Sequence, residues 1–266
     1  MVEGPAIWAL DVDSREAATT TDGRWGVESG ALRQHARTAV QTLVIAMDGT
    51  AGSGKSSASR GVAQALDLRY LDSGAMYRAM TWQMLLDGLD VTDAAAVAGR
   101  ATTAVIESGT DPAKPTIKLG GVEVSRQIRS DGVTAAVSAV SAVPGVRQLL
   151  VEQQRALIGS GGIVVEGRDI GTVVAPDAGL KVYLSADPSA RARRRSAEMA
   201  VDSSRDVQSV QADLLRRDSY DSSRPISPLS VAADAVRIDS TYLSLEAVVD
   251  TVVGLALERV GVPASE

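Results

Sequence analysis

The chain has 266 residues, of which 45% are hydrophobic and 23% are charged, and its formal net charge is −6. This composition can support a buried core, which argues against an intrinsically disordered protein, and the acidic balance disfavours a nucleic-acid partner. The sequence contains neither a hydrophobic run near the ~20 residues of a membrane helix nor the pattern of a secretory signal. It has no cysteine, which excludes disulfides and thiol nucleophiles and fits the cytoplasm, where we expect a monomer without a membrane partner.

Residues 1–40 show no sustained helical or strand periodicity, and we expect a flexible N-terminal extension there. From Thr42 onward, hydrophobic runs typical of buried parallel strands alternate with helix-like stretches. The expected strands are 42–47, 163–165, 181–184 and 235–238, and the expected helices are 56–66, 74–86, 146–158, 189–199, 207–218 and 244–260. This alternation predicts one α/β domain over residues 41–266, with a central parallel sheet flanked by helices.

One segment breaks the α/β alternation. Residues 116–119 and 122–124 alternate hydrophobic with polar side chains on either side of Gly120 and Gly121, which predicts a two-residue β-hairpin. The hairpin lies within the long connection of about residues 73–150 between the first strand and the later ones. We therefore expect a small inserted subdomain over that range.

A glycine-rich segment, Gly49-Thr-Ala-Gly-Ser-Gly-Lys-Ser56, matches the phosphate-loop pattern G-x-x-x-x-G-K-[ST] and lies between a strand-like and a helix-like run. Glycine lets successive backbone N–H groups face a phosphate, and the N-terminus of the following helix adds partial positive charge. Lys55 is expected to reach the β- and γ-phosphates, and Ser56 to ligate Mg²⁺. The expected nucleotide-binding residues are Gly49, Thr50, Ala51, Gly52, Ser53, Gly54, Lys55, Ser56 and Ser57.

Polar residues near two further segments are expected to face the same site. Ser73 is the expected N-cap of a helix that carries Arg78. The segment Glu166–Gly171, with Arg168 and Asp169, follows the strand 163–165, and ligands in parallel sheets bind at the carboxyl ends of strands. We therefore expect these side chains to lie near the phosphate loop.

Arginines are concentrated in two stretches, 191–195 and 216–224, in a chain with only four lysines among its 27 basic residues. Taken singly, each stretch could be a solvated helix face. Arginine, however, offers paired planar donors that suit phosphate oxygens. Because the two stretches bracket a polar segment, we predict a mobile lid over about residues 189–224 that closes over phosphates and excludes water.

The phosphate loop alone leaves several protein classes open. The sequence has no asparagine, so it lacks the Asn-Lys-x-Asp motif of GTP-dependent switches, while a non-kinase ATPase stays possible. The only histidine, His35, lies in the expected extension, which disfavours histidine-dependent catalysis. Among kinases, UMP, AMP and a sugar-like alcohol remain candidate acceptors, and an alcohol would need a carboxylate base that Asp72 could supply.

These motifs together resemble the bacterial cytidylate (CMP) kinase family of P-loop nucleoside monophosphate kinases, over about residues 42–260. The resemblance is carried by residues 49–56, 71–78, 124–129, 143–147, 166–174, 217–224, 228–229 and 239–241. The long insertion with a hairpin distinguishes this family from shorter monophosphate kinases. Two features depart from its pattern: the 40-residue leader, and Glu166 where the family often has Asp.

The resemblance implies transfer of a phosphoryl group from ATP, with Mg²⁺, to CMP or dCMP, for pyrimidine nucleotide supply. The implied catalytic residues are Lys55, Arg168, Arg194 and Arg224. In the implied CMP site, Ser138, Arg147 and Asp169 read the cytosine, Arg217 and Asp221 hold the ribose, Arg78, Arg168 and Arg224 bind the monophosphate, and Ser73 and Tyr77 complete the site. Glu166 is expected to contact Mg²⁺ through a water molecule.

Overall fold

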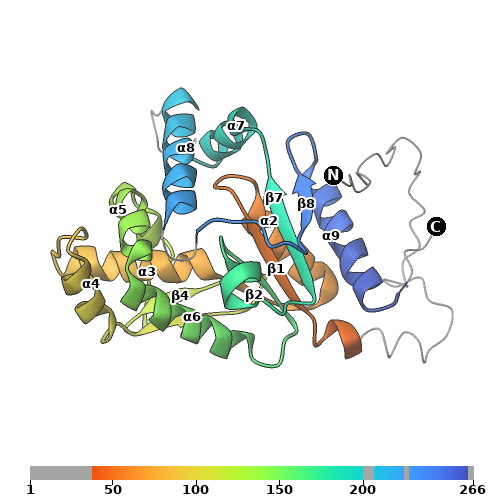
Figure 1. The fold of residues 1–266 in the computed structure, drawn as a ribbon, viewed down its shortest axis with the longest axis horizontal. Coiled ribbons are helices and arrows are strands. Elements are labelled where there is room, and N and C mark those ends of the chain that lie inside the picture. The colour runs from red at the N-terminus through yellow and green to blue at the C-terminus, as the bar shows by residue number, and fades with distance from the viewer. Residues whose placement is uncertain (1–37, 200–206, 225–227, 263–266) are drawn as a thin grey trace, which may run out of the picture.

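The computed structural model describes residues 38–199, 207–224 and 228–262 (Figure 1). Its central sheet has five parallel strands in the order β2-β6-β1-β7-β8. These strands are β1 (Val44–Gly49), β2 (Arg69–Asp72), β6 (Ile163–Glu166), β7 (Leu180–Ser185) and β8 (Val236–Asp239). The predicted α/β class and parallel sheet are confirmed, and β2 is a strand that the sequence reasoning did not predict.

Helices cover both faces of this sheet, so both faces are buried. One face packs against α2 (Lys55–Leu66) and α9 (Leu245–Arg259), and the other against α3 (Ser73–Leu86) and α6 (Pro144–Ile158). Along β1, Ile45 and Met47 enter the first core and Ala46 enters the second, as expected when side chains alternate between the faces of a strand. Two-sided burial explains why the strand sequences are continuously hydrophobic.

A second, antiparallel sheet lies between α3 and α6, within the expected insertion. Its elements are α4 (Ala94–Ala101), β3 (Ile106–Ser108), β4 (Ile117–Leu119), β5 (Val122–Glu123), the 3₁₀ turn η1 (Gln127–Arg129) and α5 (Asp131–Ala142). The predicted hairpin is confirmed, with Gly120 and Gly121 at its turn, both at positive φ. The insertion limits of 73 and 150 stay predictions.

The expected N-terminal extension of residues 1–40 lies mostly outside the described residues, which begin at Thr38. Val40 is only 1% exposed and packs in the core that α2 and α9 share. The described structure therefore already belongs to the core just before the predicted boundary at residue 41.

The expected lid corresponds to α7 (Pro188–Met199) and α8 (Val207–Ser223), which pack against each other and follow β7 (Figure 1). Residues 200–206 of that segment lie outside the described residues. The helix expected at 207–218 continues to Ser223, so Arg217 and Asp221 both lie on α8.

Within the described residues, no single helix is both long and hydrophobic enough for a membrane span; α5 and α6, which are bent by 93° to each other, meet that length and composition only as a pair.

The end of β1 admits only glycine at position 49. Gly49 has a φ of 147°, and an added Cβ would lie 1.9 Å from the carbonyl oxygen of Leu184 on β7. Glycine thus lets the chain leave the sheet in close contact with its neighbour strand and enter the phosphate loop.

Asp48, one residue earlier, ties β1 to the loop that follows β6. Its buried carboxylate accepts hydrogen bonds from the backbone N–H groups of Ile170, at 2.8 Å, and Gly171, at 2.7 Å. These two residues open the π-helical turn η2 (Ile170–Val174). Because Arg168 and Asp169 directly precede that turn, Asp48 helps to fix their position.

The Asp48 carboxyl makes the stability of the fold depend on pH. Burial raises its pKa from 3.8 to about 6, although the two backbone hydrogen bonds act in the opposite direction. A carboxyl with a raised pKa in the folded state favours folding most at acidic pH, and that contribution is lost as the pH rises through about 6. Relative to Asp48→Asn, we therefore predict that the wild type loses about 1 kcal/mol of unfolding free energy between pH 5 and pH 8.

Urea unfolding of both proteins at several pH values measures this difference. Titrating groups that do not interact with Asp48 are common to the two proteins and cancel, so the difference reports Asp48 with its charged neighbours Asp169 and Lys55. A difference in unfolding free energy that stays constant across this pH range would contradict the prediction.

Candidate functional site

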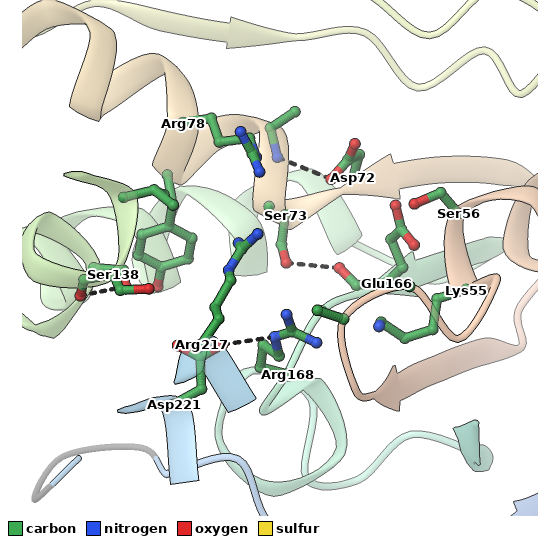
Figure 2. Close-up of a pocket in the computed structure, with 18 of the residues that line it drawn as sticks. Lys55, Ser56, Asp72, Ser73, Arg78, Ser138, Glu166, Arg168, Arg217 and Asp221 are labelled. Atoms are coloured by element: carbon green, nitrogen blue, oxygen red, sulfur yellow. Dashed lines mark hydrogen bonds and ion pairs between the residues drawn. The ribbon is translucent and has the colours of Figure 1, made fainter. Parts of the chain in front are cut away.

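A cavity lies at the carboxyl edge of the parallel sheet, bounded by the phosphate loop, the start of α3, the loop after β6, and α5 and α8 (Figure 2). The sequence-predicted residues that line it are Ala51, Gly52, Gly54, Lys55, Ser56, Ser57, Ser73, Tyr77, Arg78, Ser138, Arg147, Glu166, Arg168, Asp169, Arg217, Asp221 and Arg224. The structure therefore brings the phosphate loop and the expected acceptor residues to one shared cavity.

Four predicted residues do not line the cavity. Gly49, Thr50 and Ser53 belong to the phosphate-loop segment but are not part of the cavity lining. Arg194 instead donates to the Ser240 hydroxyl, at 3.0 Å, and to backbone carbonyls of the β8–α9 connection. Its neighbour Arg195 lines the cavity. Within a run of three arginines, no sequence signal identifies the one that faces the site.

Further lining residues that the sequence reasoning missed come mainly from the insertion. Arg129 follows the hairpin, and Ser141 lies on α5, a helix that was not predicted. Leu214 on α8 adds a hydrophobic contact. A signal for α5 was present in the sequence, since its buried residues Val133, Ala136, Val137 and Val140 recur at helical spacing.

The phosphate loop presents the groups that a phosphate needs. Gly54 caps α2 in the left-handed region, with a φ of 89°, and Lys55 begins that helix. The Lys55 amine donates to the carbonyl of Thr50 at 2.6 Å. Burial, together with nearby Arg168, lowers the pKa of Lys55. An anion bound at this helix N-terminus would stabilise the charged amine.

Glu166, at the end of β6, directs one carboxylate oxygen toward the phosphate loop. Its Oε1 accepts from the Tyr70 hydroxyl at 2.7 Å, while its buried Oε2 has no hydrogen-bond partner among the described residues. Burial and the neighbouring Asp72 carboxylate raise the pKa of Glu166. Figure 2 shows Ser56 and Lys55 beside this carboxylate.

These oxygens suit Mg²⁺, which prefers carboxylate and hydroxyl oxygens and commonly completes its shell with waters and substrate phosphates. The Ser56 hydroxyl and the unpartnered Oε2 of Glu166 are the groups that fit such an ion. No cluster of three or more acidic or histidine ligands occurs among the described residues.

Asp72 and Ser73 have roles that differ from the expected ones. Asp72, not Ser73, is the N-cap of α3, and its carboxylate accepts from the Ala75 N–H at 2.8 Å. Ser73 is the first helical residue and donates to the backbone carbonyl of Glu166 at 2.6 Å. The capping geometry thus uses the residue before the expected one and leaves the Ser73 hydroxyl to join α3 to β6.

A buried ion pair lies on the side of the cavity away from the phosphate loop. Arg147, on α6, donates to Asp169, and both side chains are almost fully buried. The Arg147 guanidinium lies 5.5 Å from the centre of the Tyr77 ring. Ser138 and Ser141 on α5 also line this side. A carboxylate, a guanidinium and hydroxyls in one buried pocket can read the edge of a polar ring by hydrogen bonding.

Arg168 connects the two halves of the cavity. Its Nε donates to Asp221 on α8 at 2.9 Å, and its Nη1 donates to the Gly49 carbonyl of the phosphate loop. The Arg78 guanidinium donates to two neutral groups, the Ile128 carbonyl at 3.0 Å and the Thr134 hydroxyl at 3.1 Å. The positive charge of Arg78 is therefore not compensated by those bonds.

Positive charge exceeds negative charge in the cavity lining. The basic residues are Lys55, Arg78, Arg129, Arg147, Arg168, Arg195, Arg217 and Arg224, and the acidic residues are Asp72, Glu166, Asp169 and Asp221. Burial and the arginines around it, Arg217 first, lower the pKa of Arg78 to about 9. Burial and Arg168 lower the pKa of Arg217 to about 10. A phosphate anion would relieve this repulsion.

Comparison with known proteins agrees with this arrangement. The model of the cytidylate kinase family matches residues 45–258. The cytidylate kinase of Streptomyces avermitilis is 51% identical over 88% of this chain and 98% of its own. That of Streptomyces griseus subsp. griseus is 51% identical over 82% and 94%, and that of Rhodococcus jostii is 52% identical over 82% and 96%. The chain belongs to the cytidylate kinase family.

Proposed function

We propose that the protein transfers the γ-phosphoryl group of ATP to CMP or dCMP, giving ADP and CDP or dCDP. The observation that carries this proposal is the cavity that Lys55 of the phosphate loop shares with the arginines of an acceptor site. Membership of the cytidylate kinase family supports it. Action as a cytoplasmic monomer, without nucleic-acid or membrane partners, is part of the same proposal.

The proposed chemistry needs charge neutralisation more than a strong base. The second pKa of a phosphate monoester is about 6, so the acceptor is largely a dianion near neutral pH. The difficulty is that two anions must meet in line. Lys55 would hold the donor phosphates, while Arg78 and Arg224 would hold the acceptor phosphate. Arg168 has contacts to both sides, which suits a group that stabilises the transferring phosphoryl.

Mg²⁺ bound with ATP would neutralise phosphate charge and align the reacting groups. Ser56 and Glu166 would hold it, Glu166 directly or through a water molecule. The Tyr70 hydroxyl fixes Oε1 of Glu166 and so orients the other oxygen.

Cytosine would be chosen by the polarity of its hydrogen bonds. Cytosine offers an amino donor where uracil offers a carbonyl acceptor. The Asp169 carboxylate, held by Arg147, would accept from that amine and repel the uracil carbonyl. Ser138 would add a hydroxyl on the same side, and Arg217 with Asp221 would hold the ribose.

The first test is an assay of ADP release from Mg·ATP with CMP, UMP, AMP and GMP as acceptors. We expect CMP to give the highest kcat/KM. Replacing Arg168 by Met should lower kcat about 10²–10³-fold, because a preorganised donor to the transferring charge is lost. Arg193→Met is the matched control, since Arg193 is exposed on α7 and should retain activity. Absence of CMP-dependent ADP release by the wild type would overturn the proposed function.

The second prediction concerns base selection by Asp169. Asp169→Asn should lower the CMP-to-UMP ratio of kcat/KM by about tenfold or more, because the amide can donate to the uracil carbonyl. Asp177→Asn removes an exposed carboxylate after η2 and should leave the ratio unchanged. If steady-state kinetics give the same ratio for Asp169→Asn and the wild type, Asp169 does not select the base.

The third prediction concerns the excess positive charge. CMP at 100 times its Kd should add about 2.7 kcal/mol to the unfolding free energy of the wild type. At the same CMP concentration, Arg78→Met should gain less than half of this, because the buried charge that the phosphate neutralises is gone. Arg237→Met, on the edge strand β8, is the control and should match the wild type. Thermal unfolding measures all three, and an equal gain for Arg78→Met would count against its phosphate role.

A further inference from the structure

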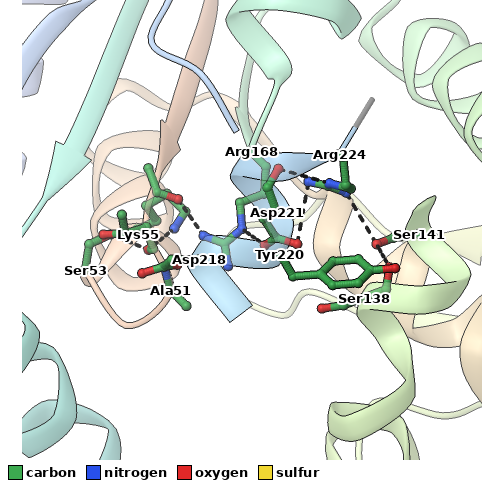
Figure 3. A network of polar contacts seen from close by, with 12 residues as sticks. Ala51, Ser53, Lys55, Ser138, Ser141, Arg168, Asp218, Tyr220, Asp221 and Arg224 are labelled. Atoms are coloured by element: carbon green, nitrogen blue, oxygen red, sulfur yellow. Dashed lines mark hydrogen bonds and ion pairs between the residues drawn. The ribbon is translucent and has the colours of Figure 1, made fainter. Parts of the chain in front are cut away.

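Two charged side chains from the lid helices hold the backbone of Ala51, in the phosphate loop. The carboxylate of Asp218 on α8 accepts from the Ala51 N–H at 3.0 Å. The guanidinium of Arg191 on α7 donates to the Ala51 carbonyl at 3.0 Å and also pairs with Asp218. These side chains are only 4% exposed for Arg191 and 13% for Asp218. Figure 3 shows Asp218 beside Ala51. We call this pair the Ala51 clamp.

Hydrophobic packing supports the same contact. The Ala51 side chain packs with Ala192 of α7 and with Val210 and Leu214 of α8. An added Cβ on Gly52 would lie 3.3 Å from the Arg191 carbonyl oxygen, closer than ordinary van der Waals contact. The two helices therefore rest directly on the donor loop, through polar and hydrophobic contacts together.

The same helix, α8, also carries residues of the acceptor side. Arg217 and Asp221, four residues apart on one face of α8, line the cavity together with Arg224, which directly follows the helix. Asp221 accepts from Arg168, and Arg224 reaches the Ser141 hydroxyl of α5 at 3.4 Å. Figure 3 shows Asp218 on the phosphate-loop side of this network and Arg224 on the α5 side. Asp218 does not belong to the described lining of the cavity.

From this geometry we propose that Arg191 and Asp218 are positioning residues that couple the ATP site to the CMP site. The proposal rests on the proposed function. The donor phosphates fix the conformation of the phosphate loop. Because Arg191 and Asp218 hold the backbone of Ala51, a fixed loop also fixes the position of α8. The residues of α8 that line the acceptor side are then held in the positions that bind CMP. Each substrate then binds more tightly when the other is present, because both bind best to the same position of α8 relative to the phosphate loop.

The test compares the Kd of CMP alone with its Kd in the presence of Mg²⁺ and the non-hydrolysable β,γ-imido analogue of ATP. Isothermal titration calorimetry measures both values. We expect the analogue to tighten CMP binding about fivefold or more in the wild type, the lower range of typical allosteric coupling. In Asp218→Asn the amide can still accept from Ala51 but cannot pair with Arg191 as a charge, and the ratio should fall below about twofold.

A merely structural role makes a different prediction. Loss of general stability would weaken CMP binding with and without the analogue alike, and would leave the ratio unchanged. The clamp predicts that the Kd for CMP alone is nearly unchanged while the KM for CMP at saturating ATP rises. A ratio in Asp218→Asn equal to that of the wild type would overturn the proposal.

The matched control is Asp213→Asn, which neutralises a carboxylate on the same helix that pairs with the exposed Arg216. It should retain wild-type coupling and activity. Arg191→Gln and the double variant complete a mutant cycle. If the pair acts as one unit, the double variant loses no more coupling than either single variant; losses that multiply would overturn the proposal.

Arg191→Lys keeps the buried positive charge and tests the clamp if Asp218→Asn does not fold. Arg191 makes both contacts through one guanidinium nitrogen, Nη1, which the rigid planar group holds between Asp218 and the Ala51 carbonyl. Lysine can pair with Asp218, but its flexible, shorter side chain does not hold an ammonium at that fixed point between the two acceptors. We expect reduced coupling in a folded protein, and full wild-type coupling would overturn the proposal. A wild type that binds neither CMP nor the ATP analogue contradicts the proposed function, whereas one that binds both without mutual effect contradicts only the clamp.

Discussion

Repulsion among buried basic side chains is the interaction on which the site depends. The cavity lining has more arginine and lysine than aspartate and glutamate, and burial with neighbouring arginines lowers the pKa of Arg78 and Arg217. A folded domain tolerates such a cluster only where its scaffold is rigid, because the charges favour opening of the cavity. The same repulsion makes the site selective for anions, since phosphate oxygens replace the repulsion with charge-assisted hydrogen bonds. The favourable free energy of phosphate binding thus comes in part from relief of the repulsion among these basic side chains.

The rigid scaffold that bears this cost is the carboxyl edge of the parallel sheet. β1 ends in the phosphate loop, β2 ends at Asp72, and β6 ends at Glu166, and β6 lies between the other two strands. The ends of these three adjacent strands therefore place the phosphate loop and two carboxylates along the same edge of the sheet. Asp48 extends this order to the next loop, because its two backbone hydrogen bonds fix the turn that follows Asp169. Close packing explains why the approach of Gly49 to β7 leaves no room for a Cβ.

Elements whose structure is determined by a local pattern can be predicted from the sequence. The hydrophobic strands and the glycine hairpin each have a signal within a few residues, and both are confirmed. The segment 49–56 lies between β1 and α2, which is the strand and helix context expected of a phosphate loop. The elements β2 and α5 were not predicted. β2 contains only two hydrophobic residues, Tyr70 and Leu71, a run too short to indicate a strand without the rest of the fold. The buried residues Val133, Ala136, Val137 and Val140 of α5 do follow helical spacing, so that helix had a signal in the sequence. Two details depend on the position of a single residue along a helix, which sequence patterns do not resolve. These are which of Arg194 and Arg195 lines the cavity, and which of Asp72 and Ser73 is the N-cap of α3.

The contacts of Glu166 show the same dependence on packing. Glu166 is buried, and burial of a carboxylate is costly unless its oxygens have partners. Tyr70 supplies one partner from the adjacent strand β2, through a hydroxyl that is itself buried. An aspartate at this position would withdraw the carboxylate by one methylene, and the Tyr70 hydroxyl would lose its acceptor. Tyr70 and Glu166 therefore form one unit: the tyrosine fixes one oxygen, and the longer side chain carries the other toward the phosphate loop, where a cation bound with the nucleotide would meet it.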